Sequence, residues 1–307
     1  MPNVFVPRIG PRRIAGGVGI IVVAGAAILF CRPDACGQAF TLSREQMVKY
    51  TSQNPYDRFP DGRPKVPDAL LNRLADMSSE EVMVAGRGTD QYTDRWQILH
   101  PGKKLIGRAV TLYLIPVRPE VAEVDATEWK KLGNTTNLSH QTALDMLQPG
   151  DVIVVDAGGG CASGGIIGDN LAYYIWKKTG TGFVIDGAIR DLEGIAQFDM
   201  AGYYRCATPP PIHGQMVAGI NVPVRIGRTT VLPGDVVFGD REGVTFIPPQ
   251  ALKGLIDTAQ NTHIHDEWTR KKFDEGKYKS TDIYYRPADP ALQKEYEEYL
   301  NSRRPKP

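Results

Sequence analysis

A strand, a glycine-rich loop, a helix and a second strand follow one another in the middle of the chain. The apolar run "DVIVV" (151–155) leads into "DAGGGCASGGIIGDN" (156–170), a helix is predicted from about Asn170, and "GFVIDGA" (182–188) reads as another buried strand. This order is typical of a parallel strand pair joined by a crossover helix. The segment 222–248, in contrast, reads as short strands separated by Gly, Pro and Asp turns. Because both kinds of unit are present, the sequence predicts a mixed α/β fold and not a plain doubly wound sheet.

The other segments complete this organisation. Helical patterns are predicted at 43–52, at 68–88, from His140 and at 251–276, and a strand is predicted at 103–117. We therefore expect four parts. They are a signal peptide or membrane anchor (1–39), an extension (40–64), one α/β domain (65–276) and a C-terminal tail or helical arm (277–307).

The N-terminus has the pattern of a secretory signal. "MPNVFVPRIGPRR" is basic, the run Ile14–Cys31 carries no charge, and the small residues of "ACGQA" follow it. Export with cleavage is the preferred interpretation, so the protein would be periplasmic or extracellular. A retained membrane anchor is the alternative, because the length of the run borders the spanning range.

Four cysteines do not form a disulfide framework by their spacing. Cleavage would remove Cys31 and Cys36 and leave Cys161 and Cys206. These two could pair in an oxidising compartment, but their separation says nothing about geometry. A buried free thiol is the preferred interpretation for each.

The glycine-rich loop does not match a dinucleotide-binding loop. The pattern G-x-G-x-x-G fails from Gly158 because position 163 is serine, and no G-x-x-x-x-G-K-[ST] occurs. Another role of the glycines is to permit backbone turns with positive φ. The more informative feature is Arg190-Asp191, which follows the strand 182–188 directly. A guanidinium can hold a substrate carboxylate in a bidentate way, and a carboxylate can hold a hard divalent ion.

Four motifs resemble those of a known family. They are "PGDVIVVDAGGG", "GDNLA", "GFVIDGAIRD" and "VPVRIGRTTVLPGDVVFGDREGVTFIP". In this order they are similar to the RraA-like family of 4-hydroxy-4-methyl-2-oxoglutarate/4-carboxy-4-hydroxy-2-oxoadipate aldolases and regulators of ribonuclease E activity. The resemblance covers about residues 70–275. It implies the swivelling β/β/α fold of that family and assembly as a homotrimer or as a hexamer of two trimers.

The resemblance also implies roles for individual residues. Asp191 would bind Mg²⁺ or Mn²⁺ directly, and Asp169 would contact the ion through water. Gly168 and the backbone N–H groups of Asn170 and Leu171 would receive the carboxylate of a 2-oxo acid, as helix N-termini suit anions. Arg190, with the metal, would stabilise the pyruvate enolate that forms when the C–C bond breaks.

One position departs from the family pattern. In the signature, Arg-Asp is followed by two residues and then an acid. This chain has Gly194 at the position of that acid, while Glu193 stands one place early. A further acid would come from a neighbouring subunit, and Glu267 is the residue that matches best. An exposed helix is the alternative explanation for the charge of Glu267.

The remaining candidates carry weaker signals. His263 and His265 would point to different faces of a helix, His213 could line the site or lie in a surface loop, and His100 and His140 carry no pattern. The turn "GDREG" (239–243) is expected to be structural. The net charge of +1 gives no reason to expect nucleic acid as a partner.

The family resemblance implies a metal-dependent lyase that cleaves a 4-hydroxy-2-oxo acid and releases pyruvate. Decarboxylation of oxaloacetate passes through the same enolate and is an expected side activity. One alternative is a non-catalytic regulator that binds another protein. Another is a different lyase or hydrolase on the same scaffold.

Overall fold

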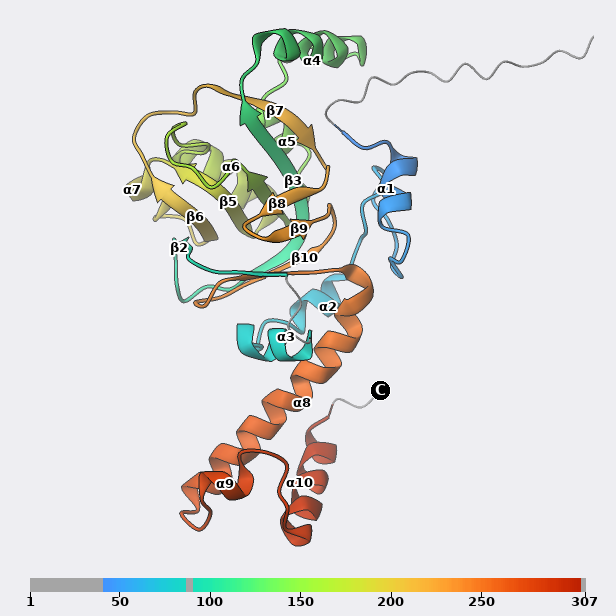
Figure 1. The fold of residues 1–307 in the computed structure, drawn as a ribbon, viewed down its shortest axis with the longest axis vertical. Helices are drawn as coiled ribbons and strands as arrows, with labels where there is room; N and C mark the ends of the chain where they lie inside the picture. Colours follow the sequence, from blue (N-terminus) through green and yellow to red (C-terminus); the bar gives the residue numbers. More distant parts are fainter. Residues whose placement is uncertain (1–40, 87–90, 305–307) are drawn as a thin grey trace, which may run out of the picture. The chain divides into compact units, whose positions relative to one another are not determined.

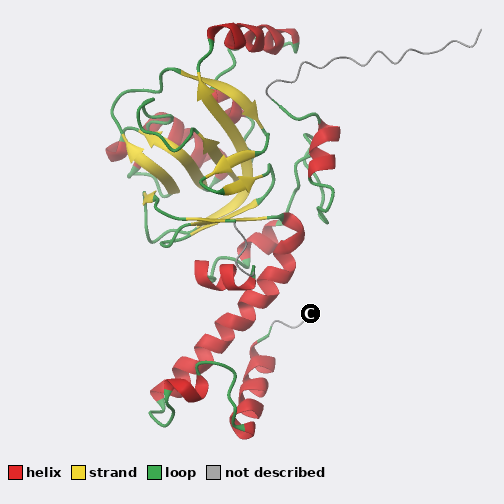
Figure 2. Ribbon diagram, in the orientation of Figure 1, coloured by secondary structure: helices red, strands yellow, loops and turns green. Residues whose placement is uncertain are grey.

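The computed structural model describes residues 41–86 and 91–304, and a nine-stranded mixed sheet forms its centre (Figures 1 and 2). The predicted signal or anchor segment (1–39) lies outside the described residues. The order along the sheet is β1-β11-β10-β3-β4-β5-β6-β2, and β7 pairs with β3. The long central strands are β3 (Leu105–Pro116), β4 (Asp151–Asp156), β5 (Gly182–Ile189) and β6 (Ala201–Ala207). The other strands are β1 (Tyr92–Thr93), β2 (Gln97–Ile98), β7 (Gln215–Ile220), β10 (Val236–Gly239) and β11 (Val244–Ile247), with β8 (Val224–Ile226) and β9 (Thr229–Val231) forming a separate hairpin.

The parallel pairing expected of a strand–helix–strand unit is confirmed. Strands β3, β4, β5 and β6 are parallel neighbours, whereas β7 and β10 pair with β3 in the antiparallel sense. Between β4 and β5 the chain forms α6 (Asp169–Thr179), which ends at Gly180 in the left-handed conformation, φ 71°. The result is a mixed α/β fold with a curled sheet, as Figure 1 shows.

Both faces of the parallel strands are buried. On one face, Ile153 and Ile185 pack with Ile175 of α6 in a single apolar cluster. On the other face, Val154 packs with Val231 of the β8–β9 hairpin. Strands covered on both faces read as continuous apolar runs, which explains the pattern of 151–155.

Nine further helices surround the sheet or extend from it, within the part of the chain that the structure describes. They are α1 (Arg44–Tyr50), α2 (Asp68–Asn72), α3 (Ser79–Ala85), α4 (Pro119–Lys131), α5 (His140–Asp145), α7 (Leu192–Ile195), α8 (Pro249–Asp274), α9 (Ser280–Ile283) and α10 (Pro290–Arg303). Among the residues described, no helix has both the length and the apolar composition that crossing a bilayer would require.

Two predictions of local structure were wrong or incomplete. The helix predicted at 68–88 is two helices, because Ser78 caps a new one: its side chain accepts from the N–H of Glu81, whose carboxylate accepts from the N–H of Ser78. Helix α4 was not predicted. Its Val121 and Val124 are exposed, so the apolar residues do not form the single buried stripe that marks an amphipathic helix.

Candidate active site

Strand β5 delivers Arg190 and Asp191 to the carboxyl edge of the sheet. All eight residues of β5 are buried, and the chain leaves the sheet directly after Ile189. Asp191 has φ 59°, an uncommon conformation for a non-glycine residue, and it precedes the short helix α7. Arg190 Nη1 donates to Asp191 Oδ2 at 2.6 Å, and both side chains are about one-third exposed. The structure thus brings a cation and a carboxylate together at a solvent-accessible strand end.

The end of the glycine-rich loop lies against this pair. Ile166 N–H donates to Ala188 O, and Arg190 N–H donates to Ile167 O, both at 2.9 Å. These bonds hold Gly168 beside Arg190 and Asp191. A Cβ on Gly168 would overlap Asp191 Oδ2 and lie 2.9 Å from Arg190 Cζ. A side chain at position 168 would therefore displace the ends of the Arg190 and Asp191 side chains, whereas glycine lets the backbone approach this pair.

Asp169 occupies the space next to Gly194. A Cβ on Gly194 would lie 2.7 Å from the Cβ of Asp169 and 2.9 Å from its Oδ2. Such distances are shorter than real Cβ contacts, so no side chain fits at 194 while Asp169 keeps this position. The exposed Glu193 precedes Gly194 in the same short helix. The side chain of Asp169 thus lies against the position at which the family signature has an acid.

The carboxylates of Asp169 and Asp191 suit a magnesium-type ion. Carboxylate oxygens are the ligands that Mg²⁺ prefers, and it is commonly bound through one or two of them plus waters and substrate oxygens. Among the described residues, no group of three or more His, Cys, Asp or Glu side chains could hold a metal by itself. Two carboxylates would hold such an ion only together with water or substrate oxygens.

The helix N-terminus is present where the sequence predicts it. Asn170 N–H, however, already donates to Asp169 Oδ1 at 2.7 Å. Leu171 N–H belongs to the first turn of α6, whose N–H groups have no acceptor within the helix. Of the two predicted donors, Leu171 is thus the one that this arrangement leaves for a substrate carboxylate.

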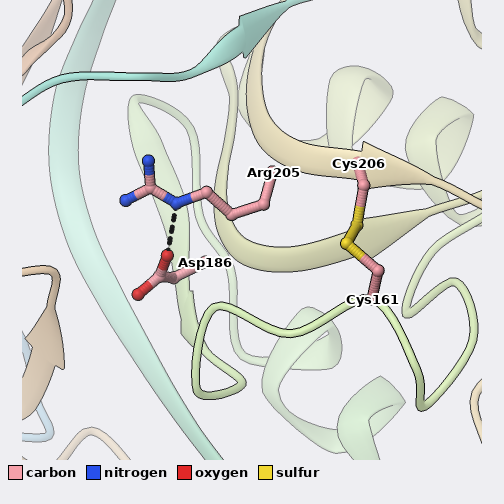
Figure 3. The surroundings of a disulfide bond; sticks show 4 residues. All are labelled: Cys161, Asp186, Arg205 and Cys206. Atoms are coloured by element: carbon pink, nitrogen blue, oxygen red, sulfur yellow. Dashed lines mark hydrogen bonds and ion pairs between the residues drawn. A yellow bond between two sulfur atoms is a disulfide. The ribbon is translucent and has the colours of Figure 1, made fainter.

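The free-thiol interpretation of Cys161 and Cys206 was wrong, because the two form a disulfide (Figure 3). Cys161 lies in the glycine-rich loop and Cys206 in β6, which pairs with β5 through Ala188↔Cys206. The separation of 45 residues gave no sign of this proximity. The disulfide therefore attaches the loop to the strand that neighbours Arg190.

A second ion pair that the sequence did not reveal lies beside the disulfide. Arg205 Nε donates to Asp186 Oδ1 at 2.5 Å (Figure 3). The Arg205 guanidinium also lies 3.6 Å from the ring centroid of Trp96. Asp186 also accepts from Gly227 N–H, and Arg205 donates to Asp94 O. Since these groups are partnered within the protein, they stabilise the fold beside the site and are not free for ligand.

The other predicted residues lie elsewhere. Glu267, in α8, forms an ion pair with Arg303 at 3.1 Å, so its contribution to a neighbouring subunit's site stays a prediction. His263 contacts Glu81, His213 contacts Pro211 O, and His100 contacts Met200 O. The "GDREG" turn is structural: the carboxylate of Asp240 accepts from the backbone N–H and the hydroxyl of Ser79.

Comparison with known proteins identifies the family of this chain. Residues 64–246, more than half of the chain, match the family model "RraA-like: Aldolase/RraA". The chain belongs to this family.

Two curated relatives illustrate the match. A protein of Halalkalibacterium halodurans named "Putative 4-hydroxy-4-methyl-2-oxoglutarate aldolase" is 34% identical over 131 residues, which cover 43% of this chain and 62% of the relative. The 4-hydroxy-4-methyl-2-oxoglutarate aldolase of Thermus thermophilus is 32% identical over 99 residues, covering 32% of this chain and 60% of the relative. The matched regions therefore span about three-fifths of the length of these relatives.

One solved structure is similar over a longer region. It is the crystal structure of Streptomyces coelicolor RraAS2, an unusual member of the RNase ES inhibitor RraA protein family. Its TM-score is 0.59 at 27% identity, covering 68% of this chain and 100% of that one. The family thus contains proteins named as aldolases and proteins named as inhibitors of an RNase.

Proposed function

We propose that the protein is a divalent-metal-dependent lyase that cleaves a 4-hydroxy-2-oxo acid and releases pyruvate. The observation that carries the proposal is the contact of Gly168 with Arg190 and Asp191, which places a helix N-terminus, a guanidinium and two carboxylates around one exposed point. Relatives named 4-hydroxy-4-methyl-2-oxoglutarate aldolase support this substrate class.

The residues act on a substrate with an anionic carboxylate and a 2-oxo group. The N–H of Leu171 and the positive end of the α6 dipole receive the carboxylate. Arg190 lies where its guanidinium can stabilise the negative charge that develops on the 2-oxo oxygen as the C3–C4 bond breaks. Asp191 and, through water, Asp169 would hold Mg²⁺ or Mn²⁺, and the ion would supply Lewis-acid polarisation of the substrate oxygens.

The cleavage requires a base that accepts the proton of the 4-hydroxyl group, and we assign this role to Asp169. The 4-hydroxyl loses its proton, the electrons of the C3–C4 bond move into the enolate of pyruvate, and C3 then takes up a proton. Asp169 lies at the same edge of the site, and its carboxylate can accept the hydroxyl proton through one water. Oxaloacetate would lose CO₂ and give the same enolate, so it serves as a second test substrate.

The experiment measures pyruvate release from 4-hydroxy-4-methyl-2-oxoglutarate and from oxaloacetate, with Mg²⁺ or Mn²⁺ and with EDTA. We expect activity with metal only, a loss of at least 100-fold in Asp191→Asn and Arg190→Gln, and near-wild-type activity in Glu193→Gln. The last variant is the matched control, because Glu193 is an exposed acid of α7 beside the site. Equal inactivity of the wild-type protein and Asp191→Asn on both substrates would reject the proposal.

A protein-binding regulator is the second candidate. It is favoured by the likeness to RraAS2, whose whole length aligns with this chain. This candidate would replace the lyase proposal on two results together. The wild-type protein would be inactive on both substrates, and the wild type and Arg190→Gln would capture a partner protein equally.

We further propose that the protein works in an oxidising compartment and as a trimer. The Cys161–Cys206 disulfide supports export, since disulfides persist mainly in extracellular or periplasmic proteins. The trimer follows from the family resemblance, with Glu267 of a neighbouring subunit completing the metal site. Retention of full-length protein with Met1 in the cytosol would contradict export, and a monomer by light scattering would contradict the trimer.

A further inference from the structure

A cavity of about 280 Å³ lies where α4 and the start of α5 meet the ends of β3 and β7. Most of its lining is apolar and includes Leu138 and Met216. The polar lining residues are Asp125, Ser139, His140 and Gln215. Small-molecule sites are typically such concave apolar pockets with a few polar groups, and ~300 Å³ is near their lower size limit. The cavity therefore has the size and lining of a site for a small molecule.

Asp125 is the unusual member of this lining. Its side chain belongs to a residue only 4% exposed, and its Oδ1 has no hydrogen-bond partner among the described residues. Burial raises the pKa of this carboxyl. A buried carboxylate is costly unless a cation or hydrogen-bond donors accompany it. Within the described part of the chain, one carboxylate oxygen of Asp125 thus lacks the hydrogen-bond partner that buried acids normally have.

The neighbouring polar groups are also acceptors. Gln215 Nε2 donates to Ser163 Oγ at 2.7 Å, and its Oε1 is buried without a partner among the described residues. Burial lowers the pKa of His140, so its ring is neutral at physiological pH and offers one acceptor nitrogen. Of the described residues that line the cavity, none is Lys or Arg. The cavity therefore offers acceptors and one potential negative charge but no cation.

We propose that this cavity binds a small primary alkylammonium ion. An ammonium group has three N–H donors, and Asp125, Gln215 and His140 provide three acceptors of matching polarity. The positive charge compensates the carboxylate, and the alkyl chain contacts the apolar lining around Leu138 and Met216.

This cavity is separate from the candidate active site. The glycine-rich loop lies between them: Ile212, which lines the cavity, donates its N–H to Gly165 O at 3.0 Å. On the other side, a Cβ on Gly165 would lie 2.7 Å from Arg190 Cβ. Binding to the cavity can therefore be measured without reference to pyruvate release.

The test uses three probes with the same carbon skeleton: butylammonium, 1-butanol and butyrate. Isothermal titration calorimetry at pH 7.5 on the full chain should show saturable binding of butylammonium, with 1-butanol at least tenfold weaker and butyrate not bound. Asp125→Asn should weaken butylammonium binding at least tenfold. Glu123→Gln should leave it unchanged, because Glu123 is an exposed acid on the same helix.

A second variant guards against a folding defect in Asp125→Asn. Ala126→Leu fills the cavity while Asp125 stays in place, and it should also abolish butylammonium binding with an unchanged far-ultraviolet circular dichroism spectrum. Three results would overturn the proposal: no butylammonium binding by the wild-type protein, equal binding of 1-butanol, or unchanged binding in both variants. The first would leave Asp125 as a buried carboxyl without an ammonium ligand.

Discussion

Asp169 occupies the space that a side chain at position 194 would need: a Cβ on Gly194 would lie 2.9 Å from Asp169 Oδ2. Asp169 is the first residue of α6, and Gly194 lies within the four-residue helix α7 that follows β5. A side chain at 194 and the present position of Asp169 therefore exclude each other. This chain has glycine where the family signature has an acid at position 194, and the side chain of Asp169 lies in the space that a side chain at 194 would need.

Gly194→Ala should accordingly impair the metal site. We expect at least a tenfold loss in kcat/KM for pyruvate release and weaker Mn²⁺ binding by calorimetry, because the methyl group displaces the Asp169 carboxylate. The matched control is Gly254→Ala in α8, where a Cβ meets nothing within 4 Å. That change should leave activity intact and stabilise the helix by about 0.5–1 kcal/mol. Wild-type activity and Mn²⁺ affinity in Gly194→Ala would refute the role given to Asp169.

The buried ion pair between Arg63 and Asp151 should contribute more to the free energy of unfolding than a surface ion pair does. Arg63 donates from Nη1 and Nη2 to the two carboxylate oxygens of Asp151, and neither side chain is exposed. Arg63→Met leaves Asp151 as an unpaired buried charge and should lower the free energy of unfolding by about 3–5 kcal/mol. Arg73→Met removes the more exposed pair with Asp257 and should cost less than about 1 kcal/mol. Urea denaturation compares them, and equal losses would contradict the ranking.

Reduction of the disulfide should destabilise the protein without unfolding it at room temperature. The bond closes a loop with a sequence separation of 45 residues. The chain-entropy relation then gives a stabilisation of about 4 kcal/mol. A reducing agent, or the double change Cys161→Ser and Cys206→Ser, should remove this amount from the free energy of unfolding. The double variant should not respond further to reductant. Alkylation of Cys161 and Cys206 in the native oxidised protein, detected by peptide mass spectrometry, would contradict the bond.

Asp235 should give stability a defined pH dependence. Burial raises the pKa of this carboxyl to about 7, and its Oδ2 accepts from Leu232 N–H. In the unfolded chain it titrates near ~4, so between these values the folded state holds a proton that the unfolded state has released. Stability contributed by this proton is complete below about pH 4 and is lost as the pH rises through about 7.

Asp235→Asn keeps an acceptor for Leu232 but cannot ionise. Relative to the wild type, its free energy of unfolding should therefore increase by about 2–3 kcal/mol between pH 5 and pH 8. Asp76→Asn, at an exposed turn position, should follow the wild-type profile. Urea denaturation at the two pH values checks both variants, and parallel profiles for Asp235→Asn and the wild type would show that Asp235 does not titrate in this range.

The sequence was sufficient for features that depend on local pattern. The apolar runs before Asp156 and before Arg190 predicted parallel strands, and the structure confirms their pairing. The position of Arg190 and Asp191 at a strand end followed directly, because the carboxyl ends of parallel strands meet at one edge.

Features that depend on distant parts of the chain were not accessible. Cys161 and Cys206 are brought together by the pairing of β5 with β6, and no spacing rule encodes that register. Asp125 drew no attention because one acid among charged helix residues looks solvent-exposed. Only the packing of α4 over the ends of β3 and β7 buries it. The close approach of Asp169 to Gly194 was not predictable either, because it depends on how α6 packs against α7.

The glycine-rich loop is fastened to the segment after β6 at several points. Besides the disulfide, Gly165 N–H donates to Pro210 O at 2.8 Å, and His213 N–H donates to Ser163 O at 2.8 Å. The loop and residues 206–213 therefore form one structural unit, although Cys161 and Cys206 lie 45 positions apart along the chain. A chimaera that imports the loop of a relative without the matching segment would lose these attachments. Exchanges between family members should carry both pieces together.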